Sequence, residues 1–291
     1  MKFQLSLLVA IIAIGLSSCK KNVDPALQPP KINFYFKFDS TQARLNNIGL
    51  PSTLPAGHGG QSPRFNLMSA HYLELAPNAL TPLGSGQVLY RAPEVTTGGS
   101  NAIDFSKSNF AGNNGLFFSA PISAFATGTY TYLRVSLAYQ NYNVWITTPT
   151  AAVDATVASF IGFNTYLTTY KVKDSSIVVN GNRAQGYWAL EGQALGLGFV
   201  TSGQAPAGST TVPNPIASTS PIPAGSCVVT AAFTSPLVVT GTETGDININ
   251  VSLSTNKSFE WIDGNGNNKY EPLLGETVVD MGIRGMIPTK Q

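Results

Sequence analysis

Oxygen-bearing side chains alternate along the stretch FEWIDGNGNNKYEPLLGE at 259–276, interrupted at Lys269. The side chains concerned are those of Asp263, Asn265, Asn267 and Glu271. Glycines between them let the backbone curl, so alternate oxygens can converge on one hard cation. Calcium takes roughly six to eight oxygen ligands in loops of this kind. The stretch therefore predicts a weak calcium site between the final two strands, to which Lys269 would add only its backbone carbonyl.

This stretch resembles the calcium loops of the serine-aspartate-repeat B-domain type, which are β-sandwich modules of bacterial surface proteins. That family has Trp-x-Asp-x-Asn-x-Asp-Gly, then an acidic residue and a later glutamate. The matching positions are Trp261, Asp263, Asn265, Asn267, Glu271 and Glu276. The chain departs from the pattern at Asn267, which replaces a charged ligand, and at Asn268, which replaces glycine. The resemblance implies calcium binding of modest affinity, and an Asx-rich turn without metal is the alternative interpretation.

The two histidines of the chain, His58 and His71, offer an alternative metal site. Copper or zinc would require both imidazoles together with a carboxylate such as Glu74. The region 31–145 resembles the methanobactin-associated copper-binding family in its short first strand, long insertion and later Gly-Thr-Tyr before a strand. That resemblance implies a periplasmic copper- or zinc-binding protein. In the alternative interpretation, His58 lies in a flexible loop and His71 lies on a strand face.

Motifs of the common catalytic classes do not occur in the sequence. It contains no Gly-x-Ser-x-Gly, no His-Glu-x-x-His, no phosphate loop and no dinucleotide fingerprint, so we expect no enzymatic activity. Many aromatic residues lie among Asn, Gln and Thr, as they do in sugar-binding sandwiches that stack rings on pyranose faces. The alternative is that these rings form core and cross-strand pairs. The rings are those of Tyr130, Tyr132, Tyr139, Tyr142, Trp145, Tyr166, Tyr170, Tyr187 and Trp188.

The chain opens with an apolar run from Leu5 to Leu16, followed by Ser-Ser-Cys. The run is shorter than the ~20 residues that span a bilayer and has the length of a signal-peptide core. Leu-Ser-Ser-Cys19 resembles the lipobox of bacterial lipoproteins, whose cysteine carries acyl chains after the signal is removed. The resemblance implies a signal peptide at 1–18, a lipidated tether at 19–30 and a lipid bilayer as partner, because two or more acyl chains anchor stably.

The lipobox, the short tether and the neutral β-rich body together resemble the uncharacterised cell-envelope lipoproteins of Bacteroidota-type bacteria. That resemblance implies a location at the cell outer membrane, facing either leaflet. It implies no particular activity.

Charged residues are scarce, with 17 Lys and Arg against 15 Asp and Glu in 291 residues, and they form no basic stripe. Nucleic acid is therefore a poor partner for this chain, and a glycan or a protein is the ligand to consider. Cys227 is the one cysteine besides Cys19, so acylation of Cys19 would leave no intramolecular disulfide. Cys227 begins the strand-like CVVTAAF, where a buried and inert thiol is expected.

The hydrophobic pattern that must position these residues is that of strands rather than helices. Alternation and apolar runs predict strands at 32–38, 71–75, 87–92, 116–122, 129–139, 157–163, 166–172, 227–233, 236–241 and 246–254. A hairpin is expected at 175–192, because Asn180-Gly181 adopts the positive φ of tight hairpin turns. Two Pro- and Gly-rich stretches, 50–66 and 204–226, predict long surface loops.

Short strands punctuated by Gly, Pro and Asn predict an all-β protein. We expect an antiparallel β-sandwich of immunoglobulin-like or transthyretin-like type at 31–291, with few or no helices after the signal peptide and a soft boundary near 148–152. The expected function is that of a lipid-anchored cell-envelope protein, a non-catalytic binding or structural module. A carbohydrate-binding or carbohydrate-processing lipoprotein and a periplasmic copper- or zinc-binding protein are the alternatives.

Overall fold

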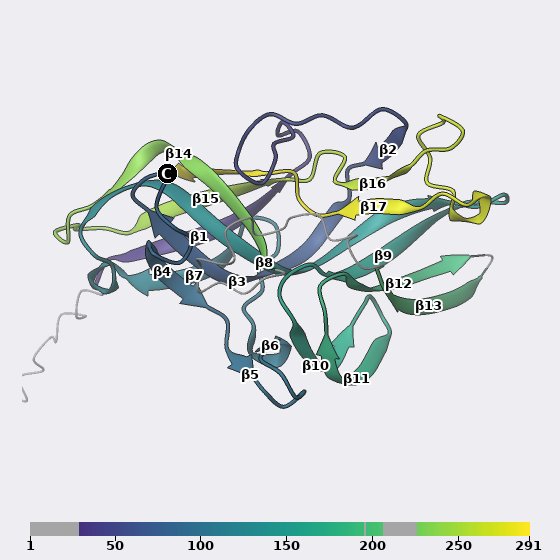
Figure 1. Cartoon of the computed structure of the whole chain (residues 1–291), viewed down its shortest axis with the longest axis horizontal. Helices are drawn as coiled ribbons and strands as arrows, with labels where there is room; N and C mark the ends of the chain where they lie inside the picture. The colour runs from purple at the N-terminus through teal and green to yellow at the C-terminus, as the bar shows by residue number, and fades with distance from the viewer. Residues whose placement is uncertain (1–28, 195, 206–225) are drawn as a thin grey trace, which may run out of the picture.

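The computed structural model describes residues 29–194, 196–205 and 226–291 (Figure 1). Cys19, the signal peptide and residues 206–225 of the expected loop lie outside the described residues. The described chain consists of β-strands, turns and the short 3-10 helices η1 (Phe105–Lys107), η2 (Ile122–Ala124) and η4 (Pro272–Leu274). The expectation of an all-β, sandwich-like fold is thus confirmed. No helix in the described part of the chain has the length and apolar character of a membrane crossing.

A seven-stranded sheet occupies the centre of the molecule (Figure 1). Its strands in spatial order are β13 (Leu197–Gln204), β12 (Tyr187–Ala194), β9 (Ala152–Phe160), β8 (Gly128–Thr147), β3 (Arg64–Ala76) and β4 (Gln87–Arg91). The seventh strand, β14 (Cys227–Val239), also pairs with β8. Every pair in this sheet is antiparallel.

The 20-residue strand β8 holds this sheet together. Its first half pairs with β14 and its second half with β9 along one edge, whereas β3 pairs along the other. The partner changes at Ala138, whose carbonyl accepts the N–H groups of Ile161 and Gly162 at 3.0 and 3.1 Å. A Cβ at Gly162 would collide with the Leu137 carbonyl, so this close approach requires glycine.

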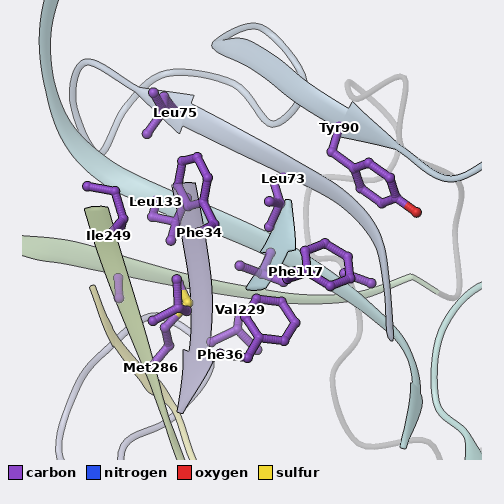
Figure 2. Packing of buried hydrophobic residues seen from close by; sticks show 14 of the residues in the cluster. Phe34, Phe36, Leu73, Leu75, Tyr90, Phe117, Leu133, Val229, Ile249 and Met286 are labelled. Atoms are coloured by element: carbon purple, nitrogen blue, oxygen red, sulfur yellow. The ribbon is translucent and has the colours of Figure 1, made fainter. Parts of the chain in front are cut away.

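A four-stranded sheet packs on the first half of β8 and encloses the main core (Figure 2). Its order is β18 (Met286–Lys290), β15 (Ile247–Ser254), β1 (Lys31–Asp39) and β7 (Gly115–Pro121), with β1 and β15 parallel. The alternating apolar residues of β1 and β15 point into this core, as their spacing predicts. The rings of Phe36 and Phe117 stack there with centroids 4.4 Å apart.

Two smaller sheets cover the second half of β8. One consists of β17 (Val278–Met281), β16 (Phe259–Ile262) and β2 (His58–Gln61), and the other of β11 (Ser176–Arg183), β10 (Thr165–Lys171), β6 (Ala102–Asp104) and β5 (Glu94–Val95). The first packs Phe259 and Trp261 against the Tyr142 side of β8. The second packs Tyr170 with Tyr139 and Phe160. The second half of β8 is therefore covered by apolar clusters from both small sheets.

The hairpin expected at 175–192 is wrong. Strand β11 continues through Asn180-Gly181 and pairs with β10, while β12 pairs with β9 and β13. Asn180 does adopt a positive φ of 49°, but the pairing register shifts at this point, so the residue forms a bulge instead of a turn. The chain reverses at Gly186, whose φ is 88°.

Several boundaries also differ from those expected. The strands expected at 227–233 and 236–241 form one strand, β14, which ends at Val239 and has a register shift that accommodates Pro236. The expected loop at 50–66 contains β2 and the start of β3. The soft boundary at 148–152 is the hairpin turn between β8 and β9, closed by the Thr148 N–H and the Ala151 carbonyl at 2.8 Å.

Candidate functional site

A cavity of about 710 Å³ lies between the central sheet and the stretch 276–284, which contains β17. Strands β8, β9, β12 and β14 each contribute to its lining. The walls are mostly aliphatic and aromatic, and they include Val144, Ile146, Val157, Trp188, Val229, Phe259, Tyr270 and Met281. Small-molecule sites have volumes of roughly 300–1,000 Å³ and walls of this kind. This cavity is therefore the candidate binding site of the described chain.

The wall at 276–284 is held in place from behind by aromatic packing. Among the described strands, β17 pairs with β16 alone, with Met281 opposite Phe259 and Val278 opposite Trp261. Trp261 is fully buried, and its indole lies so close to Gly59 that a Cβ there would collide with the ring. The Gln140 side-chain amide donates to the Met281 carbonyl, which ties β17 to β8.

Three polar groups that line the cavity carry a buried atom without a hydrogen-bond partner among the described residues. The first is Glu276, which is 8% exposed; its Oε2 accepts the Glu271 N–H at 2.6 Å and its Oε1 has no partner. The second is Asp280, whose Oδ2 pairs with Arg284 at 2.7 Å while Oδ1 has no partner. The third is the Ser159 hydroxyl. Other buried polar atoms of the described chain also have no partner, but these three border a cavity and can be reached by the hydrogen-bonding groups of a ligand.

A buried ionic cluster lies directly behind this wall. Glu260 on β16 contacts Arg44 at 2.9 Å, Arg284 at 3.4 Å and His58 Nδ1 at 2.6 Å. Burial alone would raise the pKa of Glu260, but hydrogen bonds from His58 and Arg44 outweigh it and lower that pKa below its ordinary value. The cluster joins the loop at Arg44 to both β16 and the end of the cavity wall.

Cys227 lines the cavity as a free, buried thiol. Burial raises its pKa to about 12, and the nearby Asp280 carboxylate contributes in the same direction. A thiol is nucleophilic as its thiolate, so Cys227 is unreactive at neutral pH. The expectation of a buried cysteine at this position is confirmed.

The loop expected to bind calcium joins β16 to β17, so it does not lie between the final two strands. Its oxygens are engaged by N–H groups of the loop itself. Asp263 accepts the N–H groups of Gly266 and Asn268 at 2.9 and 2.8 Å. Asn265 and Asn267 both donate their side-chain amides to Glu271 Oε2, at 2.8 and 2.7 Å.

These hydrogen bonds give an Asx-rich turn, the arrangement named as the alternative to a metal site. The side-chain amides of Asn265 and Asn267 lower the pKa of Glu271. The side-chain oxygens of these two asparagines accept the N–H groups of Asn267 and Lys269, and Glu276 lies at the base of the loop. Within the described residues, no three His, Cys, Asp or Glu side chains are grouped so as to hold a metal ion.

The structure does not bring His58 and His71 together. His58 is on β2 beside Glu260, whereas His71 is fully buried on β3 with its Nε2 2.8 Å from Glu94. Glu74 contacts neither ring, because it accepts the N–H groups of a turn at 84–86 and pairs with Arg134. His58 thus lies in a strand and not in a loop, and His71 lies on a strand as expected. Burial lowers the pKa of His71, although Glu94 opposes this shift.

Five of the nine aromatic residues singled out in the sequence are buried, as the structural interpretation expects, namely Tyr130, Tyr139, Tyr142, Tyr170 and Tyr187. Tyr132, Tyr166 and Trp188 are half-buried, and Trp145 is 49% exposed on β8. The Arg64 guanidinium lies 5.5 Å from the centre of the Trp145 ring and also contacts Asp154 at 2.6 Å. Asn143, two residues from Trp145, accepts the Asn66 side-chain amide at 2.8 Å. One exposed ring therefore lies beside a strip of amides and charges.

Sequence reasoning did not find the cavity, because its walls come from strands between residues 144 and 284. The available signal was a charged residue inside an apolar strand, such as Glu260 in FEWI. A chain with few charges places a carboxylate there only if the fold supplies partners. No family model, curated protein or solved structure matches the chain, so the site is interpreted from its own geometry.

Proposed function

We propose that this chain is a non-catalytic binding module of the cell envelope, anchored to a lipid bilayer at the outer membrane through acylated Cys19. The observation that carries the binding part of the proposal is the cavity of about 710 Å³ beside β17. Its size matches that of a site for a drug-sized molecule, and its walls combine apolar side chains with a few polar atoms. The proposed ligand is a small molecule with a largely apolar body.

Binding rather than covalent chemistry is supported by the state of the cavity thiol. The raised pKa of Cys227 keeps this group protonated at neutral pH. The charged groups behind the wall are engaged with one another, since Glu260 contacts Arg44, His58 and Arg284. They hold the wall in position and do not act on a bound molecule.

The binding proposal is tested with an uncharged dye whose fluorescence rises in apolar surroundings. We expect saturable binding of one dye per chain, and a decrease of about tenfold or more when Val279→Phe fills part of the cavity. The matched control is Val178→Phe, on a valine of β11 that is 68% exposed and does not line the cavity. Circular dichroism verifies that both variants are folded.

Two results would overturn the binding proposal. One is equal dye binding by the wild type and by folded Val279→Phe. The other is binding only after residues 206–225 are replaced by a short Gly-Ser linker, because the described chain leaves the cavity lining at Ala205 and returns to it at Cys227. In that case the protein's own segment, and not a ligand, is the occupant.

The anchor is tested separately by following labelled palmitate and detergent partition. Cys19→Ala should lose both the label and the membrane association, because the acylated thiol is the proposed attachment point. Cys227→Ala is the control and should keep both, since the Cys227 thiol is buried. Label that persists in the Cys19 variant would remove the lipid anchor from the proposal.

A second candidate function, glycan binding, is favoured by the surface around Trp145. An exposed ring beside Arg64, Asp154 and Asn143 offers an apolar face for a sugar ring together with groups that bind hydroxyls. Trp145→Ala should abolish retention on immobilised cell-wall polysaccharide. Phe199→Ala is the control, because Phe199 is 38% exposed outside this strip. Retention unchanged in the Trp145 variant would exclude this candidate.

A further inference from the structure

We infer that the ligand of the cavity carries a protonated amine on its apolar body, and that Glu276 binds this amine. The inference rests on the proposed function, because it concerns the same cavity. It adds a chemical class to the ligand and an anchoring residue to the site.

Glu276 is a carboxylate left half-satisfied inside an apolar site. The residue is 92% buried directly before β17, and the Glu271 N–H occupies only its Oε2. Its Oε1 is buried and has no hydrogen-bond partner among the described residues. A buried acceptor without a partner destabilises the folded state, and it does so more strongly when it is charged. A donor on the ligand relieves this destabilisation, and a cationic donor relieves it the most.

The remaining polar atoms of the cavity favour the same kind of ligand. Asp280 presents a second unpartnered carboxylate oxygen on the same wall, and Ser159 presents a hydroxyl from β9. Arg284 is the cation of the lining, but it is held by Asp280 at 2.7 Å and by Glu260 at 3.4 Å. The unpartnered atoms of the described lining are therefore two carboxylate oxygens and a hydroxyl, each of which can accept an N–H group of a ligand.

The aromatic groups of the lining also suit an ammonium group. Tyr270, Trp188 and Phe259 border the cavity, and the faces of such rings attract cations. Tyr270 is close enough to Glu276 that the carboxylate adds to the effect of burial in raising the pKa of the phenol. An amine bound at Glu276 would thus lie near an aromatic ring, while the aliphatic side chains of β8 and β9 contact the rest of the ligand.

The test uses three probes of one shape, namely 4-phenylbutylamine, 4-phenylbutanol and 4-phenylbutyrate. The protein is the full chain, and binding is followed by calorimetry and by tryptophan fluorescence, to which Trp188 contributes from the cavity lining. The amine should bind about tenfold or more tightly than the alcohol, because both can donate a hydrogen bond to Glu276 but only the amine brings an opposite charge. The carboxylate probe should bind most weakly, since it would place like charges together.

Glu276→Gln is the decisive variant, because glutamine keeps the shape and can still accept the Glu271 N–H. We expect it to reduce the affinity for the amine to that of the alcohol and to leave the affinity for the alcohol unchanged. The matched control is Asp174→Asn, which removes one carboxylate from an exposed turn outside the cavity. It should leave all three affinities unchanged.

The outcomes separate the two proposals. Equal affinity for the three probes, or an amine preference that survives Glu276→Gln, would overturn the inference and leave the cavity as a binding site. Failure of the wild-type protein to bind any of the three probes would overturn both the inference and the proposed function. A preference for the amine that disappears only in the Glu276 variant supports both.

Discussion

The two halves of β8 carry similar apolar residues but enclose different interiors. Along the first half, the four-stranded sheet fills the space with close ring contacts, such as the stack of Phe36 on Phe117 at 4.4 Å. Along the second half, Tyr142, Val144 and Ile146 face a three-stranded sheet, and a cavity of about 710 Å³ remains beside it. The same alternation of apolar residues therefore accompanies a filled core in one place and an open site in the other.

The difference follows from the covering strands. In the first half, β1 and β15 are eight or nine residues long and pair on both edges. In the second half, β17 has four residues, pairs on one edge and has a register shift opposite Trp261. The chain then continues into a loop with Gly285 at a φ of 82°. Alternation determines which side chains are buried, whereas the length and pairing of the covering strands determine whether the interior is filled.

The largest expected effect is on the free energy of unfolding, when a buried phenylalanine is truncated to alanine beside each half of β8. Phe36→Ala should lower the free energy of unfolding by about 3–5 kcal/mol, because the ring is fully enclosed and leaves a cavity. Phe259→Ala should lower the free energy of unfolding by about 1–2 kcal/mol less than Phe36→Ala, since the Phe259 ring already borders the open cavity and its removal creates less new void. Urea unfolding of both variants measures the difference. Equal losses would contradict the distinction between a filled and an open half.

The ionic cluster behind the cavity wall is expected to have the next largest effect. Glu260→Gln should lower the free energy of unfolding by about 3 kcal/mol, because it leaves Arg44 and Arg284 buried with less compensating charge. Dye binding should fall as well, since the cluster positions the wall at 276–284. Glu94→Gln, near His71 and away from the cavity, is the control and should leave dye binding unchanged.

The contribution of Glu260 also predicts a pH dependence. Its pKa in the folded protein is below the ordinary value of 4.5, so the folded state binds this proton less readily than the unfolded state. The stabilisation from the Glu260 carboxylate is therefore complete above pH 4.5, and it is lost as the pH falls through the lower pKa of the folded state. The gap in unfolding free energy between the wild type and Glu260→Gln should narrow below about pH 4.5. If the difference in unfolding free energy between the two proteins stays constant from pH 7 to pH 3, the lowered pKa of Glu260 is excluded as its cause.

The strands could largely be predicted from the sequence because their pattern is local. Ile32, Phe34 and Phe36 alternate, and all three enter the main core. The error at Asn180-Gly181 is also instructive, since its positive φ was predicted and is present. Whether such a residue forms a turn or a bulge depends on the neighbouring strand β10, which the local sequence does not specify.

The candidate site could not be predicted, because no local pattern contains it. Arg44 and Arg284 lie in loops and Glu260 lies on β16, so the three meet only because the fold brings distant segments together. Glu276 was named as a calcium ligand, yet it lines the cavity and accepts the Glu271 N–H instead. The spacing of Glu276 from the loop oxygens indicated a site residue, but the direction of its side chain depends on the cavity wall that β17 forms.

The smallest effect is expected at the loop between β16 and β17, which closes one end of the open half. If Asp263 and its neighbours bind calcium, ~10 mM calcium over a Kd of ~1 mM should add roughly 1.4 kcal/mol to the free energy of unfolding. That corresponds to a rise of a few degrees in Tm for a domain of this size. The ion would have to displace the N–H groups of Gly266 and Asn268 from the Asp263 carboxylate. Asp263→Ala should abolish the response.

Asn268→Gly sharpens this test, because two effects at that residue oppose each other. Asn268 has a φ of 54°, where glycine is unstrained, but its side-chain oxygen also accepts the Gly60 N–H at 3.0 Å. Relief of strain and loss of one hydrogen bond are each about 1 kcal/mol, so the Tm without calcium should change little. The calcium response itself should be kept or strengthened, since glycine relaxes the loop. A Tm that is the same in calcium and in chelator for the wild type would leave a hydrogen-bonded Asx turn and no metal site.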